Sequence, residues 1–105
     1  MIKLPETKTI YTRLKASAKK RNIPFNLTIP QLNNFTYPIS CSVCNTPLEY
    51  GKSLQYNSGT FDRIDSNLGY IEENLIIICW RCNRLKNNAT KKELKQLSDF
   101  YNNFI

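Results

Sequence analysis

The sequence predicts one small α+β domain of the treble-clef type, in which a knuckle, a β-hairpin and an α-helix share one metal ion. Two Cys-x-x-Cys pairs, Cys41 with Cys44 and Cys79 with Cys82, are separated by 34 residues. An apolar run, Leu75–Ile78, leads directly into the second pair. Two such pairs supply the four thiolates of a tetrahedral structural zinc site, with two ligands from each tight turn.

The small size of the chain makes a structural metal important for stability. A domain of 105 residues buries only about two thirds of the surface that its unfolded chain exposes. The sequence contains no histidine, so neither a metal ligand nor a general base can be an imidazole. The start, MIKLPETK, lacks the apolar core of a signal peptide, and no run approaches 18 apolar residues, so we expect no membrane segment. Reduced thiols in the cytoplasm favour metal binding over disulfides.

A basic helix is expected over Thr7 to Arg21. Ile10, Leu14 and Ala18 recur at four-residue spacing and form its apolar stripe. The net charge of +7 and the scarcity of acids near this helix indicate a polyanionic partner, DNA or RNA. An ordinary amphipathic helix with a solvated basic face is the alternative. The candidate phosphate contacts are Arg13, Lys15, Lys19, Lys20 and Arg21, with Arg81 inside the second cysteine pair and Arg84 and Lys86 after it.

We expect a single domain over residues 1–105 with three parts. Residues 1–40 form the basic helical N-terminal part, 41–88 the zinc-centred core and 89–105 a C-terminal helix. Thr90 and Glu93 have the spacing of a capping box at the start of that last helix. We expect the helix to pack on the domain through the apolar positions Leu94, Leu97, Tyr101 and Phe104.

Within this frame, Thr28 is expected to cap a short helix over Ile29 to Phe35. Phe61 to Ile64 and Leu75 to Ile78 are the expected strands of the hairpin. A helix then begins at the second cysteine pair and breaks at Asn87.

After the basic helix comes an ordered series of motifs: Phe25-Asn-Leu-Thr28, Cys41 with Cys44, Asp62-Arg-Ile-Asp65, Gly69-Tyr70, Glu73-Asn74, and Cys79 to Lys86. From Tyr11 to Lys86, about three quarters of the chain, this series resembles the small zinc-containing HNH-type endonucleases common in phages. The cysteine pairs and the Asp-Arg-Ile-Asp motif are specific in combination, whereas the basic helix alone is not. The resemblance implies a ββα-metal core.

The resemblance also implies roles for individual residues. Asp62 and Asn83 stand at the positions that hold a catalytic divalent ion, Mg or Mn. Asn74 matches the asparagine that orients the family's histidine and braces the hairpin loop. Arg63 replaces that histidine, and because an arginine keeps its proton near neutral pH it cannot be the base. Arg63 would instead clamp the scissile phosphate or stabilise developing charge.

Several alternatives remain open at the level of sequence. The base would be Asp65, a tyrosine such as Tyr70, or metal-bound hydroxide. On spacing alone, Asp62, Arg63 and Asp65 fit a hairpin ion-pair cluster, with Asn83 as a helix cap.

Three functions compete. The resemblance implies a DNA endonuclease located in the host cytoplasm if it is phage-encoded. The second function is a catalytically silent zinc-containing module that binds nucleic acid. The third is a protein-interaction module that uses the fold as a scaffold, since fold does not fix function.

Overall fold

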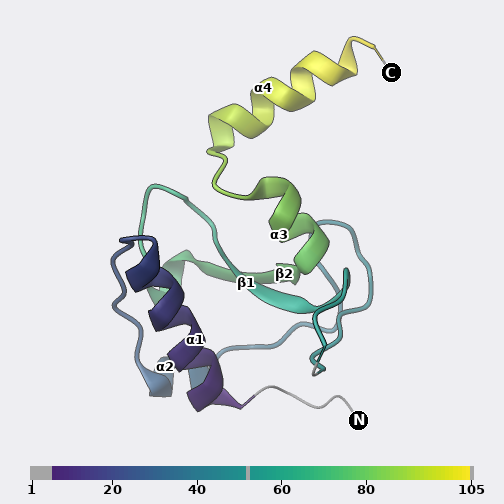
Figure 1. Cartoon of the computed structure of the whole chain (residues 1–105). Helices are drawn as coiled ribbons and strands as arrows, with labels where there is room; N and C mark the ends of the chain where they lie inside the picture. The colour runs from purple at the N-terminus through teal and green to yellow at the C-terminus, as the bar shows by residue number, and fades with distance from the viewer. Residues whose placement is uncertain (1–5, 52, 105) are drawn as a thin grey trace.

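The computed structural model describes residues 6–51 and 53–104, and it confirms the α+β class with one antiparallel hairpin (Figure 1). A helix begins at the second cysteine pair as predicted, with Cys82 in its first turn. No helix within the described ranges is both long and apolar enough to cross a membrane. In chain order the elements are α1 (Thr7–Lys20), α2 (Ile29–Asn33), β1 (Gly59–Arg63), the 3-10 helix η1 (Glu72–Asn74), β2 (Leu75–Cys79), α3 (Trp80–Lys86) and α4 (Lys91–Asn102).

The hairpin separates two environments because its side chains alternate between its faces. Phe61 pairs with Ile77 across the ladder, and both pack into the core beside α1 and α2. Asp62 pairs with Ile76 on the opposite face, which α3 covers in part. β1 begins at Gly59, two residues before the predicted start, and ends at Arg63.

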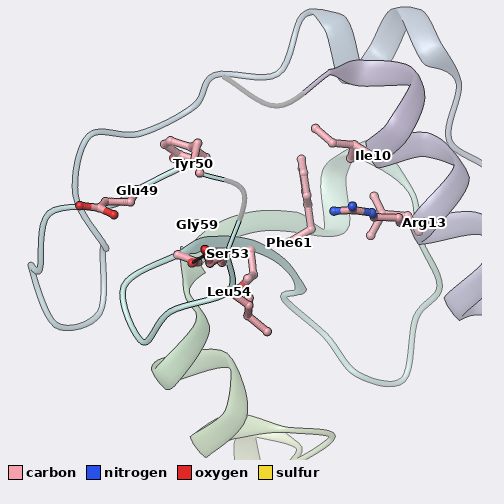
Figure 2. A pocket seen from close by; sticks show the side chains of 12 residues that line it. Ile10, Arg13, Glu49, Tyr50, Ser53, Leu54, Gly59 and Phe61 are labelled. Carbon is pink, nitrogen blue, oxygen red and sulfur yellow. Dashed lines mark hydrogen bonds between the residues drawn. The ribbon is translucent and has the colours of Figure 1, made fainter. Parts of the chain in front are cut away.

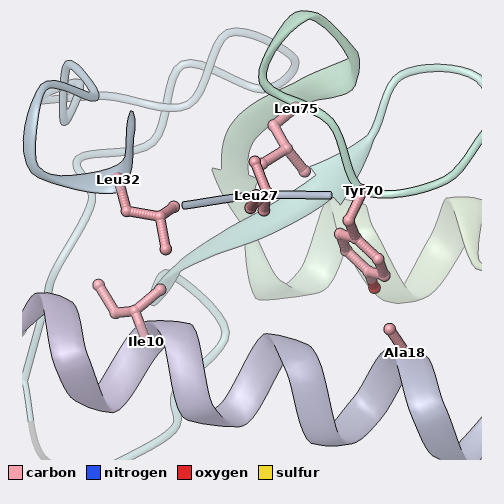
Figure 3. Close-up of a cluster of buried hydrophobic side chains, with 6 residues drawn as sticks. All are labelled: Ile10, Ala18, Leu27, Leu32, Tyr70 and Leu75. Atoms are coloured by element: carbon pink, nitrogen blue, oxygen red, sulfur yellow. The ribbon is translucent and has the colours of Figure 1, made fainter. Parts of the chain in front are cut away.

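One hydrophobic cluster joins α1 to the hairpin (Figure 3). Ile10 and Ala18 project from α1 toward the hairpin side, where the buried ring of Tyr70 lies near Ala18. Leu32 from α2 is fully buried in the same cluster, and Leu27 and Leu75 complete it. The predicted apolar stripe of α1 is therefore what positions this basic helix against the end of β1.

A second cluster contains two of the cysteines themselves. Cys41 and Cys79 are almost fully buried beside Leu48, Ile77 and Ile78. Because thiols make up part of this small core, the state of the cysteines and the packing of the hairpin depend on each other.

Local signals determine where the helices begin and end. Thr28 and Thr90 each cap their helix with a complete capping box. Asn22, just beyond α1, and Asn87, directly after α3, adopt positive φ angles of 56° and 48°, which asparagine tolerates better than most residues. These ends were predicted from sequence to within a residue or two.

The expectation that the C-terminal helix packs on the domain is wrong. α4 projects away from the rest of the chain (Figure 1), and none of its residues is buried. Only Leu94 is partly covered, whereas Leu97, Phe100, Tyr101 and Phe104 are 54–71% exposed. The apolar rhythm correctly identified an amphipathic helix, but the turn after Asn87 directs that helix outward.

A close contact at Gly69 should be sensitive to a single methyl group. A Cβ atom there would lie 2.5 Å from the Pro24 carbonyl oxygen, which also accepts a hydrogen bond from the Tyr70 amide. We expect Gly69→Ala to destabilise the zinc-loaded protein by about 1–3 kcal/mol in urea unfolding, because the short bridge between these segments must open. Gly51→Ala is the matched control, since nothing lies within 4 Å of its Cβ position. Equal stability of the two variants would contradict this account.

Candidate functional site

The sulfur atoms of Cys41, Cys44, Cys79 and Cys82 all lie within 4.8 Å of one another. The Cys44 and Cys79 sulfurs are 3.6 Å apart, and all four thiols are free of disulfides. Tetrahedral ligands at about 2.3 Å from zinc stand about 3.8 Å from each other. The cluster therefore has the donor type, number and spacing of a four-thiolate metal site.

Backbone amides support this cluster from both cysteine pairs. The Cys79 amide donates to the Cys41 sulfur and the Cys82 amide to the Cys79 sulfur, each at 3.4 Å. In the first turn, Asn45 has a φ of 64° and its amide bonds to the Cys41 carbonyl at 2.8 Å. These turns orient the thiols toward one another, and they join the knuckle to the start of α3.

The thiol pKa values show why a cation would be needed to ionise the whole cluster. Burial tends to raise the pKa of Cys41, but amide hydrogen bonds from Cys79, Cys44 and Val43 outweigh it and lower the pKa to about 6. Burial is the largest cause that raises the pKa values of Cys79 and Cys82, and neighbouring thiols raise them further. Without a cation, therefore, the cluster holds protons at neutral pH.

A polar pocket of about 280 Å³ lies between α1, the end of β1 and α3. We call it the Asp62 pocket. It contains one carboxylate, Asp62, and two guanidinium groups, Arg21 and Arg63, so its charged lining is net positive. The lining comprises Leu14, Ser17, Arg21, Phe61, Asp62, Arg63, Ser66, Tyr70, Asn83, Asn87 and Asn88.

Asp62 is buried and forms an ion pair with Lys86. The Lys86 ammonium lies 2.9 Å from Asp62 Oδ2 and also donates to the Arg63 carbonyl. Lys86 is itself partly buried, so the structure places it against the hairpin instead of on an open basic surface. The second carboxylate oxygen, Oδ1, has no hydrogen bond among the described residues.

Asn83 projects from the first turns of α3 toward β1. Its Nδ2 donates to Thr60 Oγ1 at 3.0 Å and to the Phe61 carbonyl at 3.2 Å. Since a carbonyl only accepts, the amide nitrogen must face the strand, and the Asn83 carbonyl oxygen is left to face elsewhere. This oxygen and the Asp62 carboxylate are the potential metal ligands of the pocket.

Arg63 and Asn74 both hold the loop between the strands. Arg63 donates to the carbonyls of Ser66 at 2.9 Å and Leu68 at 3.0 Å, with its guanidinium over the Tyr70 ring. Asn74 is buried and makes three hydrogen bonds to the backbone of Asp65 and Gly69. Arg63 is thus engaged with the loop and pairs with neither acid that the ion-pair alternative assigned to it.

The structure distinguishes between Asp65 and Tyr70, the two side chains considered as the base. Asp65 is exposed and caps the loop by accepting from the Asn67 amide at 2.9 Å. It does not line the Asp62 pocket, whereas the buried Tyr70 does.

The predicted basic residues occupy three different surfaces. At about 100° per residue, Arg13 and Lys20 lie on the flank of α1 next to Arg21, while Lys15 and Lys19 lie on the other flank. Arg81 and Arg84 line a separate groove with Trp80, whose ring lies 4.7 Å from the Arg84 guanidinium. The structure therefore groups only part of the basic set with the Asp62 pocket.

Sequence reasoning missed Asn88 as a member of the site. Its Oδ1 accepts from Arg21 at 2.6 Å and lies 3.4 Å from an Arg63 nitrogen, so it holds two guanidinium groups from different elements together. The Asn-Asn dipeptide carried only a helix-ending signal, because its partners lie 67 and 25 residues away.

A second hollow of about 320 Å³ adjoins the Asp62 pocket (Figure 2). Ile10 and Arg13 reach it from α1, Phe61 from β1 and Leu54 from the loop that precedes β1. The two hollows share Leu14 and Phe61 and line successive turns of α1. Together we call them the α1 trough.

The chain is similar to a protein of Enterobacteria phage T4 described as an uncharacterized 29.0 kDa protein in the dda-modA intergenic region. The two are 28% identical over 87 residues, which cover 83% of this chain and 34% of the phage protein. The chain thus spans about a third of the length of this relative. No protein-family model matches the chain, and no solved structure matches it.

The cysteine cluster predicts one tightly bound zinc ion per chain. Because thiolate binding is also folding free energy, we expect chelation or Cys82→Ser to unfold most of the domain, as read by circular dichroism and by mass spectrometry under native conditions. Zinc must displace protons from Cys79 and Cys82, whose pKa values are raised, so zinc affinity should weaken as the pH falls. A folded protein that retains its structure without metal, or one with two Cys-x-x-Cys disulfides, would contradict this prediction.

Proposed function

We propose that the protein is a metal-dependent endonuclease of the HNH type that hydrolyses DNA phosphodiesters at the Asp62 pocket. The observation that carries this proposal is that Asp62 and Asn83 line one pocket with two guanidinium groups, Arg21 and Arg63. Carboxylate and amide oxygens suit a hard divalent ion, and guanidinium groups suit phosphate oxygens. The pocket thus combines a candidate ion site with a candidate phosphate site.

The finer description of the fold belongs to this proposal. A knuckle, a hairpin and a helix around one metal form a treble clef, and an all-thiolate tetrahedral site favours zinc as the structural ion. The zinc would act structurally, because four protein ligands leave no open position for substrate. It would keep Asn83 at a set distance from β1, since Asn83 directly follows Cys82.

The catalytic ion would be Mg²⁺ or Mn²⁺, bound by the Asp62 carboxylate and the Asn83 amide oxygen. Mg²⁺ is usually held by only one or two carboxylates together with waters and substrate phosphates, so this sparse donor set fits. When bound, such an ion polarises the phosphate and generates a nucleophile from water. Lys86 shares the Asp62 carboxylate and limits its net charge when DNA is absent.

The arginines would act differently from each other. Arg21 comes from α1 and is positioned to bind a phosphate oxygen at the wall of the pocket. Arg63 is a positioning residue, because it holds the carbonyls of Ser66 and Leu68 and so maintains the loop beside Asp62. Of the two side chains considered as bases, Tyr70 lines the pocket and Asp65 does not.

The α1 trough offers a path for a DNA strand. Arg13 lines one hollow and Arg21 the other, and eight residues of helix separate them by about 12 Å. At about 3.4 Å of axial rise per nucleotide, that distance spans three to four nucleotides. A strand that follows α1 would therefore meet positive charge on both sides of the candidate cleavage site.

A silent nucleic-acid-binding module is the second candidate, and specific contacts favour it. The Lys86 ammonium already neutralises Asp62, and Arg63 occupies the position of the family's histidine while it is engaged with the loop. In this reading the pocket binds a phosphate without cleaving its ester. A protein-interaction scaffold, the third candidate, would not require the basic flank of α1.

Plasmid cleavage separates the two leading functions. We expect the zinc-loaded protein to nick supercoiled DNA only with Mg²⁺ or Mn²⁺, and Asp62→Asn and Asn83→Ala to lose about 1,000-fold in rate, since metal activation contributes several kcal/mol. Asp99→Asn is the control, because that carboxylate pairs with Lys95 on the exposed α4. If the wild type binds DNA but cuts it with neither ion, the silent module is the better description. If both site variants cut normally, the site lies elsewhere.

DNA affinity should depend on salt and on one flank of α1. We expect affinity to fall by about 0.9 log unit per log unit of salt for each phosphate neutralised. Arg13→Glu with Lys20→Glu should weaken binding much more than Lys8→Glu with Lys15→Glu, because only the first pair lies beside the α1 trough. Fluorescence anisotropy measures both effects, and the two double variants carry the same net charge. Affinity that is independent of salt, or equal losses in the two variants, would contradict the proposed path.

A further inference from the structure

The outward face of α4 is an apolar surface that the proposed nuclease function does not use. Leu97, Tyr101 and Phe104 continue the line begun by Leu94, and Phe100 widens it into an arc of about 120°. The Phe100 ring contacts its aromatic neighbours at centroid distances of 5.1 and 5.0 Å, so the rings form one patch. The charges of Lys95 and Asp99 pair with each other on the opposite face of the helix.

An apolar groove of about 380 Å³ lies at the base of this helix, on the α3 face of the hairpin. Ile76 and Ile78 of β2 line it, Leu85 of α3 and Val43 of the knuckle flank it, and Ile64 stands at its end. Leu85 and Val43 are 69% and 68% exposed, which is unusual for aliphatic side chains lining a concave surface. The groove ends at the Asp62–Lys86 ion pair, which also lines it.

The helix face and the groove are both apolar, but within one chain only Leu94 of the helix reaches the groove. Leu94 lines the groove, whereas the rest of the apolar arc continues beyond it because α4 leads outward from Asn87 (Figure 1). One chain therefore presents a convex aromatic stripe and a concave aliphatic groove side by side. Two copies related by a two-fold axis can satisfy both surfaces at once, with each helix in the other copy's groove.

The exposed area matches what such a pairing needs. Aromatic side chains bury about 150–250 Å² each, so the three aromatic rings, Leu97 and the aliphatic rim of the groove expose about 800 Å² of apolar surface per chain. Standard interfaces bury about 800 Å² per partner, whereas the largest apolar patch of a typical monomer is about 300–600 Å². Among the described residues the charges at this surface are Glu93, which is tied to the Thr90 cap, and the Asp62–Lys86 pair, and the rest of the surface is apolar, as in the cores of homodimer interfaces.

We infer that the protein forms a two-fold symmetric dimer in which α4 of each copy lies in the groove of the other. The inference does not depend on the proposed nuclease activity. Each chain carries a net charge of +7, so the two copies repel each other at low salt. Dimerisation therefore strengthens as salt rises, which is opposite to the salt dependence of phosphate binding.

The test is analytical ultracentrifugation of the zinc-loaded full chain across concentration and salt. We expect a dimer at about 100 µM or below, within the range of affinities of interfaces this size. Leu97→Glu with Phe100→Glu should weaken association by about 30-fold or more, the effect of removing an interface hot spot. The matched control, Gln96→Glu with Asn102→Glu, adds the same charge outside the apolar arc and should leave the dimer intact. Helix content by circular dichroism should be unchanged in both variants.

A mixing experiment distinguishes a helix in a groove from helices that pack only on each other. Leu85→Lys changes the groove and Phe100→Glu changes the helix, so each variant alone should be mainly monomeric. Their mixture should associate, because one helix–groove contact then keeps its natural residues and the other joins Glu to Lys. A wild-type monomer at 100 µM in high salt would overturn the inference, as would a dimer insensitive to Leu85→Lys. DNA binding is measured for the monomeric helix variant as well. If that variant still binds DNA, the dimer and the proposed function are tested independently of each other.

Discussion

The four-sulfur cluster is the constraint on which the remaining structure depends. It ties the knuckle at Cys41 and Cys44 to the buried end of β2 and the start of α3, although a long and largely irregular stretch of chain separates them. Two of its cysteines are core residues, so the second hydrophobic cluster cannot be complete while the thiols are displaced. The hairpin is only two strands wide, which is marginal by itself, and it is held between α1 on one face and the cysteine knuckle and α3 on the other. A cation that neutralises four thiolates would thus stabilise both the core and the position of Asn83.

The electrostatics of the Asp62 pocket follow from elements that are remote in sequence. The carboxylate belongs to β1, its ammonium partner to α3, and the Arg21 guanidinium to the C-terminal end of α1. Asn88 then joins that guanidinium to Arg63. This arrangement spreads positive charge around a single acid, which favours an anionic ligand in the pocket. It also commits Arg63 to the loop, since its donors hold the carbonyls of Ser66 and Leu68.

The molecule has two kinds of surface. The flank of α1 and the Asp62 pocket are basic and polar, whereas the groove and the outward arc of α4 are mainly apolar. Association at the first kind of surface releases counterions and weakens with salt, while association at the second removes apolar area from water and is helped by screening of the net charge. The two surfaces meet at Asp62, which lines both the Asp62 pocket and the groove, and its partner Lys86 lines the groove. A partner helix in the groove would therefore lie directly beside the candidate cleavage site.

The sequence by itself determined the features that depend on neighbouring residues. The cysteine spacing predicted the metal cluster, the apolar run before Cys79 predicted β2, and capping residues such as Thr28 located the helix starts. What only the tertiary structure decided depends on contacts between distant segments. Lys86 turned inward because α3 places it beside Asp62. Asn88 became a bridge because α1 packs nearby. The rest of α4 stayed exposed because, among the described residues, only its Leu94 reaches a surface of its own chain. Periodicity shows that a helix has an apolar face, but the covering of that face is set by the path of the chain.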